Sequence, residues 1–246
     1  MTEPLTPFPG DWRRALAVVA HPDDLEYGAA AAVAEWTDTG REVAYLLVTR
    51  GEAGIEGLAP EESAPLREAE QIAGAAVVGV RTVEFLGGHR DGVIEEGVAL
   101  RRDLAAAIRR HRPELLLTIN HRETFGGRAW NTPDHRAVGR AVIDAAGDAG
   151  NQWIFPEQLT EGGLERWDGV RWVAVAASPE ATHAQEVSER SVERGIASLA
   201  EHRAYISALS DLTPQEYARE LYAGAVNEVA RNFGGRPGVA FELYPR

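Results

Sequence analysis

The chain has 246 residues, 44% of them hydrophobic and 26% charged, which is the composition of an ordinary globular protein. Its net charge of −13 makes a nucleic-acid backbone or an anionic membrane surface an unfavourable partner. The absence of cysteine excludes disulfides, thiolate nucleophiles and cysteine-ligated zinc, so a metal would have to be held by His, Asp or Glu. No basic and apolar leader opens the sequence, and no apolar run approaches the roughly 20 residues of a membrane span. We therefore expect a cytoplasmic protein that binds neither nucleic acid nor membranes.

The first part of the chain alternates short apolar runs with segments of helical pattern. Buried strands are predicted at 14–20, 42–49, 82–86 and 114–120. Helices are predicted at 25–40, 64–79, 98–111 and 134–149. Strands that alternate with helices form a mostly parallel sheet covered by helices on both faces. The fold class is therefore α/β, with a Rossmann-like sheet.

The last third of the chain has a less regular pattern. Further strands are predicted at 152–155 and 171–176, and an edge strand at 239–243. Two amphipathic helices are predicted at 186–209 and 213–233. Since no internal repeat or low-complexity linker interrupts the chain, we expect one domain over 1–246. Its core would span roughly 14–150, and the part from 151 to 246 would pack on that core.

Polar side chains follow each of the first four predicted strands, and in open α/β sheets ligands bind beyond the carboxyl ends of the strands. The fold would therefore gather these residues into one crevice. They are His21, Asp23, Asp24 and Glu26 after the first strand; Arg50 and Glu52 after the second; His89 and Asp91 after the third; and Asn120, His121 and His135 after the fourth.

His21 and Asp24 are the strongest candidates for metal ligands. They are three positions apart in a turn after a buried strand, where both side chains can point at one ion, and His nitrogen and Asp oxygen suit zinc. Asp23 and Glu26 add negative charge that a cation would neutralise. The alternative is that Asp23 and Asp24 simply cap the following helix.

His135, at the start of the helix after the fourth strand, could be a third ligand and leave an open position for water. The alternative is a partly exposed histidine in the first turn, with Asp134 as the helix cap; spacing alone does not decide between them. Zinc lowers the pKa of a bound water towards about 7, and Asp23 is placed to take its remaining proton and return it to a leaving amine.

Signatures of other enzyme classes are absent from the sequence. There is no G-x-S-x-G elbow, no P-loop, no G-x-G-x-x-G after a strand and no H-E-x-x-H. The sequence therefore disfavours serine catalysis and nucleotide binding. A nucleotide-binding α/β protein is kept as a weaker hypothesis.

The segment Ala20-His-Pro-Asp-Asp-Leu-Glu26 resembles the AHPDDxE motif of the LmbE-like, or PIG-L, family of N-deacetylases. Three further segments agree with that family: Thr49-Arg-Gly-Glu-Ala-Gly54, Asp91-Gly92 and Pro133-Asp-His135. The resemblance covers roughly 14–143 well and the remainder loosely. It implies a Rossmann-like fold, one zinc ion per chain, and hydrolysis of an N-acetyl group on N-acetylglucosamine units or of a related amide.

The resemblance also implies roles for individual residues. His21, Asp24 and His135 would hold the zinc, and Asp23 would be the general base. Arg50, Glu52 and Asp91 fall where family members line the substrate pocket, and Thr132 and Asp134 belong to the motif of the third ligand. His121 and Trp130 are further candidates for the pocket because of their place in the loop after the fourth strand, not because of the resemblance. Phe125 and Trp130 could stack on a sugar face, although simple packing within the loop explains them equally well.

One departure from the family pattern concerns Thr132. Many members have a histidine at this position that helps to stabilise the oxyanion, and loss of such a donor costs on the order of 10²–10³ in rate when nothing replaces it. A threonine hydroxyl can donate a hydrogen bond but has no charge. His121, Arg50 or the metal itself are candidates to compensate.

The sequence thus predicts a zinc-dependent deacetylase of an N-acetylated amino sugar or a conjugate of one. Alternatives are an amidase of a thiol-sugar conjugate and a metal-containing binding protein with little turnover. Another divalent ion could replace zinc, since His/Asp sites follow metal availability as well as affinity. Self-association also stays open, because soluble enzymes of this size often form symmetric oligomers.

Overall fold

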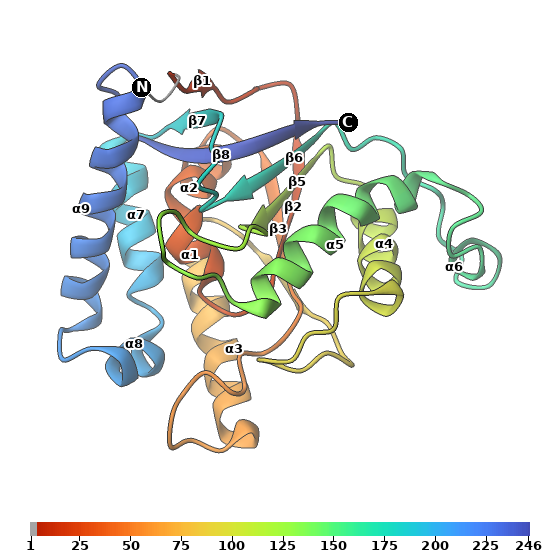
Figure 1. Ribbon diagram of the computed structural model, residues 1–246, viewed down its shortest axis with the longest axis horizontal. Coiled ribbons are helices and arrows are strands. Elements are labelled where there is room, and N and C mark those ends of the chain that lie inside the picture. Colours follow the sequence, from red (N-terminus) through yellow and green to blue (C-terminus); the bar gives the residue numbers. More distant parts are fainter. Residues whose placement is uncertain (1–3) are drawn as a thin grey trace.

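One mixed sheet forms the centre of the computed structural model, which describes residues 4–246. Within these residues the sheet has eight strands in the order β1-β7-β8-β6-β5-β2-β3-β4 (Figure 1). Neighbouring strands are parallel except for β8, which runs antiparallel to both β6 and β7. The strands are β1 (Thr6–Pro7), β2 (Arg14–Val19), β3 (Glu42–Leu47), β4 (Thr82–Phe85), β5 (Leu115–Ile119), β6 (Trp172–Ala176), β7 (His183–Glu186) and β8 (Gly238–Pro245).

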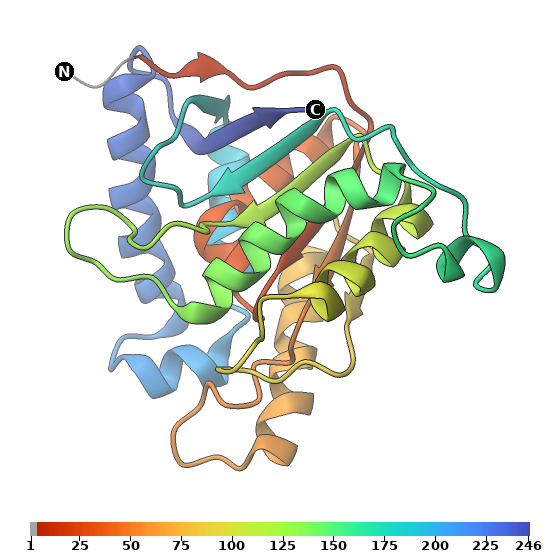
Figure 2. The same cartoon turned by 45° about the vertical axis from the view of Figure 1, so that its right-hand side comes forward.

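Helices cover both faces of this sheet, so the predicted α/β class with a mostly parallel sheet is confirmed. Figure 2 shows α4 and α5 lying across one face, while α2, α7 and α9 lie on the other side. The helices are α1 (Asp24–Gly28), α2 (Ala30–Asp38), α3 (Pro60–Val77), α4 (Val98–His111), α5 (Pro133–Gly150), α6 (Glu157–Thr160), α7 (Glu189–Leu199), α8 (Arg203–Leu209) and α9 (Pro214–Asn232).

The apolar strands divide the core into two layers. Along β2, Leu16 and Val18 pack with α4 and α5, whereas Ala17 and Val19 pack with α2 and α7. All four side chains are almost fully buried. A strand that is covered on both faces must be apolar at every position, which explains the uninterrupted apolar run from which β2 was predicted.

The strand order places the site. From β2 the chain moves outwards to β3 and β4, and then crosses back to β5 on the other side of β2. The connections therefore diverge at the carboxyl ends of β2 and β5, which is where ligands bind in open α/β sheets. The segments that follow these two strands contain His21–Asp24 and His135, respectively.

Several predicted boundaries in the first part of the chain change. The helix predicted at 25–40 is two helices, because Ala29, with φ −148°, breaks the helical path between α1 and α2. Gly28 makes the close approach to the sheet possible, since a Cβ there would lie 3.2 Å from the Cβ of Ala176. Helix α3 begins at Pro60 rather than Ala64, with proline in its first turn.

The last third differs more from its prediction. The strand predicted at 152–155 is wrong, because this segment forms a turn that leads into α6. The helix predicted at 186–209 is α7 and α8, separated around His202, and β1 and β7 were missed because they are short. The strand predicted at the C-terminal edge is β8, but it lies between β6 and β7 inside the sheet. Among residues 4–246, none of the helices has both the length and the apolar composition needed to cross a membrane.

Candidate metal and catalytic site

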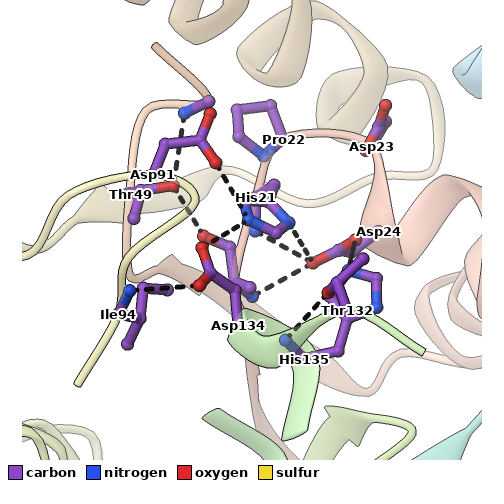
Figure 3. Close-up of polar contacts among 12 residues, drawn as sticks. His21, Pro22, Asp23, Asp24, Thr49, Asp91, Ile94, Thr132, Asp134 and His135 are labelled. Atoms are coloured by element: carbon purple, nitrogen blue, oxygen red, sulfur yellow. Dashed lines mark hydrogen bonds and ion pairs between the residues drawn. The ribbon is translucent and has the colours of Figure 1, made fainter. Parts of the chain in front are cut away.

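His21, Asp24 and His135 meet beyond the carboxyl ends of β2 and β5 (Figure 3). Their ligand atoms all lie within 4.8 Å of one another. His135 Nε2 is 2.9 Å from Asp24 Oδ1, and His21 Nδ1 is 3.7 Å from Asp24 Oδ2. Two imidazole nitrogens and one carboxylate are a donor set for a catalytic zinc with an open fourth position. The structure therefore brings together the three predicted ligands, although His135 follows the other two by more than a hundred residues in the sequence.

The hydrogen bonds around the two histidines leave the right nitrogens free for a metal. His135 Nδ1 lies 3.0 Å from Asn131 Oδ1, so this nitrogen carries the proton and Nε2 keeps its lone pair. His21 Nε2 lies 3.1 Å from both Asp134 and Asp91, so Nδ1, which faces Asp24, is the nitrogen that would bind a metal. Such carboxylate and amide partners fix the tautomer and orientation of metal-ligating histidines.

A second cluster of possible ligands comprises His21, Asp91 and Asp134. Both Asp134 oxygens already accept backbone N–H groups, from Gly92 at 2.7 Å and Ile94 at 3.0 Å. Asp91 accepts the N–H of Ala53 at 2.8 Å. Because these carboxylates are held by the backbone, they fit better as hydrogen-bond acceptors for His21 than as ligands of another ion.

One oxygen of Asp24 has no backbone donor among the described residues and lies 2.9 Å from His135 Nε2. Its Oδ2 accepts the N–H groups of Ala20 and His21, at 3.0 and 2.9 Å, whereas Oδ1 faces His135. Burial disfavours the carboxylate, but the charge and hydrogen bond of His135 and His21 outweigh it, so the pKa of Asp24 lies below its usual range. Conversely, burial opposes charging of His21, and its bonds to Asp134, Asp24 and Asp91 raise its pKa.

Asp23 lies in the turn between His21 and Asp24 with its backbone in the left-handed region, at φ 85°. Two residues of α3 hold it there: Gln71 accepts its N–H at 2.8 Å, and Arg67 donates to Oδ2 at 3.0 Å. Burial raises the pKa of Asp23 to about 7, and the positive charges of Arg67 and His202 offset only part of that rise. The predicted alternative of a simple helix cap does not describe Asp23, because its side chain makes no capping hydrogen bond.

These residues open into a cavity of about 420 Å³. His21, Asp23, Asp24 and His135 line it together with residues from other parts of the fold. The other lining residues are Tyr27, Gly54, Arg67, Asp91, Ile119, Phe125, Thr132, Ala177 and Tyr205. A metal at the three ligands would therefore face a space large enough for a small substrate.

Among the residues of this cavity that sequence reasoning missed, Arg67 and Tyr205 contact each other beside Asp23. Arg67 is almost fully buried, and it also donates to the carbonyls of Pro22 at 2.7 Å and Gly51 at 3.2 Å. The ring of Tyr205 covers its guanidinium at 4.1 Å. The sequence shows only an arginine in a helix whose first turn is acidic. That this arginine is buried becomes evident only once the packing of the helix is known.

The structure places three of the seven residues predicted at the substrate pocket at or directly behind the cavity. Asp91 and Thr132 line the cavity, and Asp134 lies directly behind His21. Thr132 caps α5, where its hydroxyl oxygen accepts the N–H of His135 at 3.2 Å.

The other four predicted pocket residues are not among those that line the cavity. Arg50 pairs with Glu68, and Glu52 accepts the N–H groups of Arg50 and Asp91, so both connect loops. Trp130 is exposed and stacks on Arg136. His121 faces Tyr244, with ring centroids 6.2 Å apart. None of these contacts brings the four side chains towards the ligand group.

Comparison with known proteins gives relatives that match rather more than half of the chain. A diacetylchitobiose deacetylase from Thermococcus kodakarensis is 30% identical over 146 residues, covering 58% of this chain and 52% of that protein. A 1D-myo-inositol 2-acetamido-2-deoxy-alpha-D-glucopyranoside deacetylase from Kineococcus radiotolerans is 34% identical over 172 residues, covering 55% and 46%. The chain thus spans about half the length of the curated relatives it matches.

The fold has solved counterparts over almost the whole chain. An N,N'-diacetylchitobiose deacetylase from Pyrococcus horikoshii, solved with an inhibitor, superposes with a TM-score of 0.82 at 22% identity. The match covers 96% of this chain and 85% of that one. The family model PIG-L, described as GlcNAc-PI de-N-acetylase, matches residues 16–146, which include most of β2, all of β3 to β5 and most of α5. The chain belongs to the PIG-L family.

Proposed function

We propose that this protein is a zinc-dependent hydrolase that removes the acetyl group from an N-acetylated amino sugar of the N-acetylglucosamine type. The observation that carries this proposal is the group His21–Asp24–His135, which opens on a cavity beside Asp23. The names of the relatives support the substrate class, since both are deacetylases of N-acetylglucosamine-type sugars. We also propose that the whole chain forms one such domain and works in the cytoplasm on a small-molecule substrate.

Zinc at this site supplies a Lewis acid that polarises the amide carbonyl and makes water a stronger acid. Asp23 is then the group that accepts a proton from the attacking water and passes it to the leaving amine. Arg67 and Gln71 hold Asp23 through contacts to the carboxylate and to the backbone N–H. Because only Oδ2 of Asp23 is bonded to Arg67, Oδ1 is free for this proton among the described residues.

Among the described residues, three hydroxyl side chains line the cavity, those of Tyr27, Thr132 and Tyr205. The hydroxyl of Tyr27 already donates to Tyr217, which leaves Thr132 and Tyr205 as possible donors to a substrate. The oxygen of Thr132 accepts the N–H of His135, so its hydroxyl proton is available to a substrate oxygen. The departure from the family's histidine at this position therefore still leaves a hydrogen-bond donor at the cavity wall.

The test is release of free amine from N-acetylglucosamine and N,N'-diacetylchitobiose by the zinc-loaded protein, compared with Asp23→Asn. We expect turnover by the unaltered protein and a loss of roughly 10²–10⁴-fold in the variant, with metal content unchanged, since a proton-transfer group contributes about that much. Asp144→Asn, at an exposed carboxylate on α5, is the control and should keep full activity.

Two outcomes would replace this function. If the protein binds zinc but neither it nor Asp23→Asn releases amine from any N-acetyl sugar, the metal-containing binding protein becomes the better description. If thiol-sugar conjugates are cleaved and simple N-acetyl sugars are not, the protein is an amidase with the same chemistry and a different substrate.

A further inference from the structure

A second hollow adjoins the catalytic cavity and has no part in the chemistry described above. It has a volume of about 460 Å³ and lies between α2, α9, β8 and the segment 177–181. Apolar side chains form most of its wall, and we call it the apolar groove. The side chains that the argument uses are Leu221, Ala225, Val226, Val229, Val239 and Ala240.

The apolar groove adjoins the catalytic cavity, since Tyr27, Phe125 and Ala177 line both. The hydroxyl of Tyr27 donates to that of Tyr217 at 2.8 Å, which fixes this part of the shared wall. Phe125 meets the ring of His135 edge-on, with centroids 5.9 Å apart. A molecule whose reacting group lies at His135 would therefore reach the groove past Phe125, at the wall that the two hollows share.

The chemistry of the wall defines what the groove can hold. Glu228 is the one charged residue among those described along it, and it would repel an anionic group. No lysine or arginine of the described wall is available to bind a phosphate or carboxylate. Pockets of roughly 300–1,000 Å³ that are lined mainly by apolar side chains bind apolar parts of small molecules.

We propose that the apolar groove binds a hydrocarbon group of the substrate, so that the protein prefers amides of amino sugars bearing an alkyl chain over simple N-acetyl sugars. This inference rests on the proposed function, and its test separates the two. The chain can be joined to the sugar in two ways, as the alkyl group of a glycoside or as the acyl group of the amide. Both present the same apolar surface to the groove.

The first experiment compares kcat/KM for the methyl and hexyl glycosides of N-acetylglucosamine, and for N-acetyl- and N-hexanoylglucosamine. Each methylene that leaves water strengthens binding roughly fourfold, so a partly buried hexyl chain should raise kcat/KM by about tenfold or more. The pair that shows the preference identifies where the chain is attached. Equal kcat/KM within both pairs would overturn the proposal while leaving the deacetylase function intact.

The variant that tests the groove is Ala225→Trp, because Ala225 is an exposed residue of α9 that lines the groove. The indole should fill the groove and remove the preference for the longer chain, without altering kcat/KM for the methyl glycoside. Ala223→Trp, also exposed on α9 but outside the groove, is the control and should keep the preference. Val229→Gln makes the wall polar without filling it and should weaken the preference as well.

A binding measurement makes the result independent of catalysis. Calorimetry with hexyl glucoside, which has no amide, should show binding at least about tenfold tighter than with methyl glucoside, and Ala225→Trp should abolish the difference. If this binding is found but no amide is cleaved, the groove does bind hydrocarbon chains and the proposed deacetylase function is wrong. If Ala225→Trp instead changes the oligomeric state and leaves the chain preference untouched, the groove is a contact between copies of the protein and the proposal is wrong.

Discussion

His21 is held from both sides of its imidazole ring, and this determines what the residue can do. One nitrogen faces Asp24, and the other is 3.1 Å from each of Asp91 and Asp134. Because the backbone N–H groups of Gly92 and Ile94 fix Asp134, the ring is oriented before any metal binds. Asp134 is therefore a positioning residue for a ligand rather than a group that contacts substrate.

This arrangement predicts that Asp134→Asn weakens metal binding by about 10–100-fold, which is the usual effect of losing a hydrogen-bond partner of a ligating histidine. Zinc affinity measured by competition with a chelator checks the prediction. The control is Asp103→Asn, which removes a similar partner, 3.0 Å from His89, away from the ligand group. Equal zinc affinity in Asp134→Asn and the unaltered protein would contradict this role for Asp134.

The sequence predicts part of the site well, for a physical reason. His21, Asp23 and Asp24 lie in one turn after a buried strand, so local spacing is enough to bring them together. Arg67, Gln71 and Tyr205 reach the site from α3 and α8, and no local pattern marks a helical residue whose partner is distant. Arg50 and Glu52 have the expected position after a strand, but their side chains are occupied by contacts between loops.

At the scale of single elements, the start of α5 connects helix stability with the site. Thr132 caps this helix, and its first turn contains both Asp134 and His135. A long loop after β5 separates this turn from the sheet, and the buried Asn131 anchors it by donating to the carbonyls of Asn120 and Arg122. The direction of His135 therefore depends on how the helix begins.

We expect Thr132→Ala to lower the free energy of unfolding by about 1 kcal/mol, the typical cost of losing a threonine cap. It should also raise the zinc concentration needed for half-maximal loading, because His135 is less firmly placed. Thr213→Ala removes the capping box at the start of α9 and is the matched control. Urea unfolding and zinc titration of both variants give the comparison; a shift in zinc loading by Thr213→Ala as well would show that the effect is not local.

Errors in predicting the elements have a common physical origin. The Ala-rich segment from 25 to 40 contains Gly28, but a single glycine within a helical pattern is not enough to predict the break at Ala29. The break arises from packing of Gly28 against β6. Likewise, β8 has the pattern of a strand, but only the tertiary structure places it between β6 and β7. Local patterns predicted most of the helices and longer strands, whereas long-range packing decided where they bend and pair.

At the scale of the whole molecule, β8 ties the last residues of the chain to the loop that leads to the site. Its Glu242 is almost fully buried and accepts hydrogen bonds from Arg122 at 3.0 Å and Ser178 at 2.6 Å, and it also contacts Tyr244. Burial disfavours the charge, but these bonds prevail and lower the pKa of Glu242 to about 2. The folded state therefore stabilises the ionised carboxylate.

The sign of the resulting pH dependence follows from that lowered pKa. The stabilisation is complete above the unfolded pKa of about 4.5 and is lost as the pH falls towards about 2. Glu242→Gln should lower the free energy of unfolding at pH 7 by on the order of 3 kcal/mol, and the gap to the unaltered protein should shrink with acidification through this range.

Urea unfolding between pH 7 and pH 3 checks this prediction. Glu180→Gln is the control, because Glu180 pairs with the same Arg122 at 2.7 Å but its side chain is 60% exposed. An exposed pair contributes at most about 1 kcal/mol, so this variant should differ little from the unaltered protein. A gap for Glu242→Gln that stays constant from pH 7 to pH 3 would contradict the account.

The central claim is that His21, Asp24 and His135 bind the ion on which activity depends. Its most direct test is the metal content of the purified protein and of His21→Ala and His135→Ala, together with amine release before and after removal of the metal by a chelator. We predict about one zinc or similar divalent ion per chain, consistent with three protein ligands and one open position, lost in both variants, and activity that disappears with the chelator and returns with zinc. Full deacetylase activity in a metal-free protein, or unchanged metal content in both variants, would contradict the account.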